Sequence, residues 1–138
     1  MMEAVLFPVL VILHLIQIAK EKNIALALAT MSDIQNVSFI IDTLGIRSSF
    51  DMIAGAEDIT NGKPHPEIYE LVLSSLKINA LEALVFEDSQ GGVLSAKAAG
   101  IEVIGICTTH SKEQFKKWGV NVCVNDFEEY ITNYMNDV

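Results

Sequence analysis

The feature that most constrains the fold is the stretch 84–92, Leu-Val-Phe-Glu-Asp-Ser-Gln-Gly-Gly, an apolar run that ends in two acids and a turn. A helical pattern follows over 93–99 and stops at Gly100. This order predicts one strand–turn–helix step of an α/β sheet. Glu87 and Asp88 would then lie at the carboxyl end of a strand, the edge where open α/β sheets bind ligands. Such acids can hold Mg²⁺ through oxygen, or they are solvated acids that begin a helix.

Strand and helix patterns alternate along the whole chain. Expected strands cover 3–7, 24–29, 50–54, 84–87, 102–107 and 120–124. Expected helices cover 9–22, a segment from a cap at Ser32 or Asp33 to Leu44, then 67–76, 93–99, 111–118 and 126–135. The alternation predicts an α/β fold with a doubly wound parallel sheet and right-handed crossovers. The 138 residues show no repeat or linker, so we expect a single domain, 1–138.

Composition excludes several classes of partner. Eighteen acidic residues against nine basic ones give a net charge of -9, which disfavours binding to nucleic acid. The apolar segment 4–19 is too short to span a membrane and contains Pro8, His14 and Gln17, so we interpret it as core, with a signal anchor as the alternative. Cys107 and Cys123 lie in apolar runs without metal-ligand spacing and indicate buried, reduced thiols in a cytoplasmic protein, although a disulfide stays open.

Three polar features follow apolar runs or turns, namely Thr30, Lys63 and the pair Glu87 and Asp88. If they meet at one sheet edge, they supply a hydroxyl, an ammonium and carboxylates that bind a cation. These groups together can hold and neutralise a phosphoryl group. Taken singly, Thr30 is also explained as a helix cap and Lys63 as a solvated loop charge.

The segments that carry these residues resemble three motifs of the haloacid dehalogenase (HAD) superfamily, in the branch of beta-phosphoglucomutase and phosphoglycolate phosphatase. They are 27–30 (Ala-Leu-Ala-Thr), 62–69 (Gly-Lys-Pro-His-Pro-Glu-Ile-Tyr) and 86–92, which continues to Ala-Ala-Gly-Ile at 98–101. The resemblance covers roughly residues 24–108 and implies a Rossmann-like HAD core. It also implies Mg²⁺-dependent phosphoryl transfer on a small phosphorylated metabolite, with inorganic phosphate as a further ligand.

The resemblance assigns a role to each matching residue. Thr30 and Lys63 are the candidate catalytic residues. Thr30 would bind phosphate and Lys63 would pair with the nucleophile and the phosphoryl charge. Ser32 would lie near the substrate phosphate, and Ser89 would support the loop that follows the acids and is a further substrate-binding candidate. Glu87 and Asp88 would place Mg²⁺, while His65 receives no role.

The chain departs from the family at its catalytic motif, Asp-x-Asp after the first strand. Pro8 and Leu10 occupy the expected positions, and no Asp-x-Asp occurs anywhere in the sequence. Neither residue can attack phosphorus or move a proton. The cap inserted in this branch also has no room between residue 7 and the next helix, which is most simply described as a deletion. We expect a weakened Mg²⁺ site, since one carboxylate is missing.

Two hypotheses about function follow. The first is a phosphatase or phosphomutase with impaired activity, because loss of a covalent nucleophile can cost on the order of 10⁶ in turnover. The second is an inactive pseudoenzyme or truncated product that binds phosphate or metal, with a homodimer covering the surface left without a cap. A signalling receiver domain has the wrong motif order, and a dinucleotide-binding domain lacks its Gly-x-Gly-x-x-Gly turn.

Overall fold

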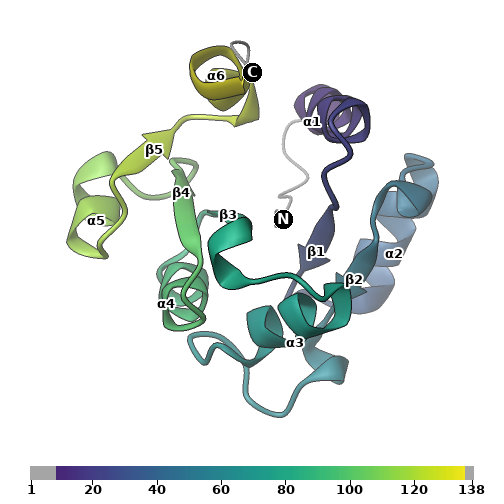
Figure 1. Ribbon diagram of the computed structural model, residues 1–138, viewed down its shortest axis with the longest axis horizontal. Coiled ribbons are helices and arrows are strands. Elements are labelled where there is room, and N and C mark those ends of the chain that lie inside the picture. Colours follow the sequence, from purple (N-terminus) through teal and green to yellow (C-terminus); the bar gives the residue numbers. More distant parts are fainter. Residues whose placement is uncertain (1–8, 136–138) are drawn as a thin grey trace.

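The structure of the protein, a computed structural model, describes residues 9–135. Strands and helices alternate along it as predicted (Figure 1). The strands are Ala27–Ala29 (β1), Met52–Ala54 (β2), Leu84–Glu87 (β3), Glu102–Ile106 (β4) and Val122–Val124 (β5). The helices are Val9–Glu21 (α1), Ile34–Thr43 (α2), Glu67–Leu76 (α3), Gln90–Ala98 (α4), Lys112–Lys117 (α5) and Phe127–Tyr130 (α6), which continues as a π-helix over Ile131–Met135. Short 3₁₀ turns cover Arg47–Ser49, Ala56–Asp58 and Ala80–Glu82. The strand expected over 3–7 and the position of Pro8 lie outside the described residues.

All strand pairs in residues 9–135 are parallel. β1 pairs with β2, and β3, β4 and β5 form a second sheet in that order. Figure 1 shows β1 and β3 as the strands at which the two sheets approach each other. The predicted α/β class with parallel strands is confirmed, although the described strands form two sheets where one was predicted.

Alternate residues of both sheets face the same two hydrophobic clusters. Leu28 of β1 and Phe86 of β3 belong to one cluster, together with buried residues of α1, α2 and α6. Ala29 of β1 and Val85 of β3 belong to the other, together with residues of α3, α4 and α5. Neighbouring residues of a strand point to opposite faces, so each cluster borders one face of both sheets. The two sheets therefore lie side by side in one layer. Helices cover both faces of that layer, which is the doubly wound arrangement.

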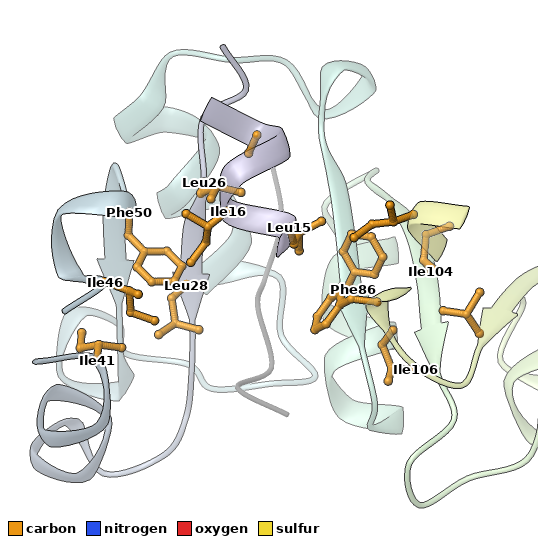
Figure 2. Packing of buried hydrophobic residues seen from close by; sticks show 14 of the residues in the cluster. Leu15, Ile16, Leu26, Leu28, Ile41, Ile46, Phe50, Phe86, Ile104 and Ile106 are labelled. Atoms are coloured by element: carbon orange, nitrogen blue, oxygen red, sulfur yellow. The ribbon is translucent and has the colours of Figure 1, made fainter. Parts of the chain in front are cut away.

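Helix α1 connects the two halves of the first cluster. Its residues Leu15 and Ile16 are buried, and Figure 2 shows Leu15 between the side chains around Leu28 and those around Phe86. Each such side chain contributes about 1.5–3 kcal/mol when fully buried. The apolar segment 4–19 was interpreted as core, and its part from residue 9 onward is a helix that packs in the core. None of the helices within residues 9–135 has the length and hydropathy needed to cross a membrane.

Helix ends follow the predicted signals. Asp33 rather than Ser32 caps α2, because its side chain accepts a hydrogen bond from the backbone N–H of Gln35. Gly45 follows α2 with a φ of 67°, and Asn23 follows α1 with a φ of 56°, so both helices stop in the left-handed conformation. The bounds of α3 are those predicted.

Four strands are shorter than predicted, since β1, β2 and β5 begin later and β4 ends one residue earlier. For β1 and β5, backbone groups of the missing residues bond elsewhere. The N–H of Leu26 donates to the side chain of Asp51, and β1 begins at Ala27, three residues after the predicted start. The N–H of Val120 donates to the carbonyl of Phe115 and closes the end of α5, which leaves β5 to begin at Val122.

The two cysteines lie on neighbouring strands. Cys107 follows β4 and Cys123 lies in β5, and both are free and half-buried. Burial raises the pKa of both thiols. They are less buried than predicted, and their proximity across β4 and β5 could not be predicted from spacing.

Candidate functional site

Lys63 joins the carboxyl ends of the two sheets. It lies in the loop before α3, and its Nζ is 2.6 Å from Oε1 of Glu87, at the end of β3. The same Nζ is 3.4 Å from the carbonyl oxygen of Ala29, at the end of β1. Only 11% of the Lys63 side chain and 3% of the Glu87 side chain are exposed. Lys63 and Glu87 thus meet at one edge of the sheets, as expected from their places in the sequence.

Glu87 points into the protein, where both carboxylate oxygens are engaged. Oε1 accepts hydrogen bonds from Lys63 and from the hydroxyl of Tyr69 at 2.7 Å. Oε2 accepts a longer hydrogen bond, 3.4 Å, from the hydroxyl of Ser89. Lys63 also lies over the ring of Tyr69, 5.2 Å from its centroid. A buried carboxylate needs such partners, because removing one side of a buried ion pair costs about 3–5 kcal/mol.

The start of α4 is built around this carboxylate. Ser89 caps the helix by accepting a hydrogen bond from the N–H of Gly92. A Cβ atom at Gly92 would lie 1.9 Å from the carboxyl carbon of Glu87, so a side chain there would displace the carboxylate. Gly92 therefore allows the helix to approach the Lys63–Glu87 pair.

The loop that carries Lys63 is fixed from two sides. The carboxylate of Glu67 accepts from the backbone N–H groups of Thr60 and Asn61, and these bonds hold the pKa of Glu67 below its ordinary value. The fully buried hydroxyl of Ser95 in α4 donates to the carbonyl of His65 at 2.6 Å. The loop therefore presents Lys63 to the sheet edge from a well-anchored backbone.

Thr30 and Ser32 lie in the turn after β1. The N–H of Thr30 donates to the carbonyl of Ala54, and its hydroxyl accepts from the N–H of Ser32. The turn packs close to the Lys63 loop, since a Cβ at Gly62 would lie 2.8 Å from Cε of Met31. Thr30 therefore occupies the same edge as Lys63. Its hydroxyl makes a local turn contact and does not cap α2, which Asp33 caps.

The two acids predicted to place Mg²⁺, Glu87 and Asp88, have different surroundings in the structure. Glu87 is bound to Lys63 and Tyr69, so Asp88, which is half-buried, is the remaining carboxylate of the predicted pair. Within the described part of the chain, no group of three or more His, Cys, Asp or Glu side chains could hold a metal ion. Binding of Mg²⁺ by Glu87 and Asp88 stays a prediction.

Three residues that contact the site had no predicted role, namely Tyr69, Gly92 and Ser95. One signal was available for Tyr69, since a tyrosine on the buried face of a helix needs a partner for its hydroxyl. Gly92 and Ser95 carried no comparable signal, because their importance depends on what lies opposite them after folding.

Comparison with known proteins gives a family match. Residues 7–106 match the family described as haloacid dehalogenase-like hydrolase. Among curated proteins, validoxylamine A 7'-phosphate phosphatase of Streptomyces hygroscopicus is 33% identical over 118 residues, 86% of this chain and 53% of that protein. Phosphorylated carbohydrates phosphatase of Thermotoga maritima is 42% identical over 89 residues, 64% of this chain and 41% of that protein. The chain spans about half the length of the curated relatives it matches.

Solved structures show the same fold. Beta-phosphoglucomutase from Clostridium difficile has 30% sequence identity and a TM-score of 0.74, with 91% of this chain and 55% of that chain covered. CbbY from Rhodobacter sphaeroides, in complex with phosphate, has 33% identity and a TM-score of 0.76, with 86% and 53% covered.

Proposed function

Because this chain belongs to the haloacid dehalogenase-like hydrolase family, in its beta-phosphoglucomutase-like branch, we propose that it binds the phosphoryl group of a small phosphorylated metabolite. The observation that carries the proposal is the position of Lys63, whose ammonium reaches the carboxyl ends of β1 and β3 together. Inorganic phosphate is the simplest ligand of this site. The phosphate bound to the related CbbY supports this choice of ligand.

Each site residue has a defined part in the proposal. Lys63 contributes positive charge, and the Thr30 hydroxyl donates a hydrogen bond to a phosphoryl oxygen. Ser32, which is exposed two residues further along, contacts the substrate side of the phosphate. Ser89 keeps the turn after β3 in place through its bonds to Glu87 and Gly92.

Phosphatase or phosphomutase chemistry is strongly reduced in this proposal. Pro8 and Leu10 stand where the family has its two catalytic aspartates, and the loss of a covalent nucleophile costs on the order of 10⁶ in turnover. Mg²⁺ enters only as a weakly held, largely hydrated ion at Asp88, and no step depends on it. The second candidate function is a pseudoenzyme that binds phosphate without turnover, and the missing aspartates favour it.

The proposal includes the organisation of the chain. Residues 1–138 form one core domain, in which the first strand, 3–7, joins the helix before the second motif directly and the cap is deleted. A homodimer would cover apolar surface that a cap would otherwise shield. The free cysteines support a cytoplasmic location. Light scattering that shows a strict monomer at high concentration would contradict the dimer.

Binding of inorganic phosphate, measured by calorimetry, tests the central claim. Lys63→Met combined with Glu87→Gln removes the charged pair together, so that no buried charge is left without its partner. Lys20→Met, on exposed surface of α1, is the matched control. We expect the wild type and the control to bind phosphate and the double variant to lose binding. Equal affinity in all three proteins would refute the site.

Phosphate release from a panel of phosphate esters, with and without Mg²⁺, separates the two candidate functions. Release at background in the wild type supports the pseudoenzyme. Mg²⁺-dependent release that disappears in the Lys63 variant supports residual phosphoryl transfer.

A further inference from the structure

We propose that Tyr69 is a positioning residue of this site, whose hydroxyl fixes the Glu87 carboxylate and, through it, the Lys63 ammonium. The inference deepens the proposed function and rests on it for the consequence on phosphate binding. The position of Lys63 can be measured without any phosphate present.

Two hydrogen bonds to one oxygen define this arrangement. The hydroxyl of Tyr69 and Nζ of Lys63 lie 2.7 Å and 2.6 Å from the same Oε1 of Glu87. Donors from α3 and from the Lys63 loop therefore fix the direction of the carboxylate, which sits on the last residue of β3. Hydrogen bonds to an ionised acceptor are roughly twice as strong as neutral ones.

Core packing explains the ring of Tyr69 but not its hydroxyl. The residue is 3% exposed and packs in the second hydrophobic cluster, where phenylalanine would fill the same volume. Its hydroxyl reaches the one buried acid that also contacts Lys63. The contact of the Lys63 ammonium with the ring face needs only the aromatic ring. Removing the hydroxyl alone thus separates positioning from packing.

Loss of the hydroxyl leaves Glu87 held by Lys63 at Oε1 and by the longer bond from Ser89 at Oε2. The carboxylate can then rotate about its last side-chain bond. Lys63 follows its partner, because the ion pair is the shortest contact of the ammonium among those described. We expect the ammonium to leave its position near the carbonyl of Ala29 for part of the time.

The test compares Tyr69→Phe with Tyr130→Phe, which removes a hydroxyl from a partly buried tyrosine in the other cluster. The first measurement is the ¹H–¹⁵N spectrum of lysine ammonium groups, with Lys63→Arg used to assign the Lys63 signal. Because Lys63 is buried and hydrogen-bonded, its ammonium exchanges slowly and gives a resolved signal in the wild type. We expect that signal to broaden or disappear in Tyr69→Phe and to persist in Tyr130→Phe.

The second measurement is the dissociation constant for inorganic phosphate. We expect it to rise about three- to tenfold in Tyr69→Phe, which lies within the net contribution of a typical hydrogen bond, because the lost bond acts on phosphate only indirectly, through Glu87 and Lys63. An unchanged Lys63 signal in Tyr69→Phe would overturn the inference, whatever happens to phosphate binding. A changed signal with no phosphate binding by the wild type would uphold the role of Tyr69 in holding Lys63 and refute the proposed function.

Discussion

Replacement of Gly92 by alanine tests how closely α4 is fitted to the buried ion pair. A Cβ at this position would lie 1.9 Å from Cδ of Glu87 and 2.0 Å from each carboxylate oxygen. The carboxylate cannot simply swing aside, because Lys63 and Tyr69 hold Oε1 and 98% of Glu87 is hidden from solvent. Either the pair breaks or the first turn of α4 moves.

Two opposing contributions determine the expected change in the free energy of unfolding. Breaking the contacts of a buried ion pair costs about 3–5 kcal/mol. Alanine is favoured over glycine in a helix by about 1 kcal/mol. The free energy of unfolding should therefore fall by about 2–4 kcal/mol in Gly92→Ala.

Gly91→Ala is the matched control, one residue earlier in the same helix. A Cβ there would meet only the Cβ of Lys63, at an ordinary 3.8 Å, within the distance considered. This variant should be unchanged or stabilised by up to about 1 kcal/mol. Urea unfolding followed by circular dichroism, with the slope m held common, measures both differences. If Gly92→Ala unfolds within about 0.5 kcal/mol of Gly91→Ala, the close fit around Glu87 is refuted.

Three further predictions concern charge and pH. Lys63→Met should lower the free energy of unfolding by about 3–5 kcal/mol, and the addition of Glu87→Leu should restore much of it, because an apolar pair replaces a lone buried charge. Glu67→Gln should destabilise the protein most above the ordinary carboxyl pKa of 4.5 and least in acid, because the lowered pKa of Glu67 gives stability that disappears as pH falls. Alkylation of Cys107 and Cys123 by iodoacetamide should be slow at pH 8 and accelerate at higher pH, because burial raises the pKa of both thiols.

Each of these three predictions has a result that would contradict it. A double variant at Lys63 and Glu87 that is less stable than Lys63→Met alone would show that the ion pair is worth more than apolar packing. Parallel stability curves for the wild type and Glu67→Gln from about pH 3 to about pH 7, on both sides of the ordinary carboxyl pKa, would exclude a role for the Glu67 carboxylate in the loss of stability in acid. Alkylation of the native cysteines as fast as in urea would contradict their burial.

Local signals in the sequence were sufficient for the order of elements and for several of their ends. Asp33, Gly45 and Asn23 act through their own backbone or a hydrogen bond within two residues, so their effect can be predicted from sequence. Ends that depend on distant partners could not be predicted, as at Leu26, whose N–H bonds a side chain 25 residues away.

The same distinction applies to the site. The placement of Thr30, Lys63 and Glu87 at one edge follows from parallel strands, whose carboxyl ends share an edge. The direction of the Glu87 side chain does not follow from that rule. It depends on Lys63 and Tyr69, which lie 24 and 18 residues away and come close only in the folded protein. The metal role assigned to Glu87 is therefore the part of the prediction with the weakest physical basis.

The Lys63–Glu87 pair also affects how the motif residues around it should be interpreted. A buried lysine requires an anion nearby. Glu87 is the anion that pairs with Lys63 in this protein. Tyr69 and Gly92 are then needed to stabilise the pair, whether or not any phosphoryl group is transferred. The stability of the fold alone is therefore a sufficient physical reason for these motif residues, with or without phosphoryl transfer.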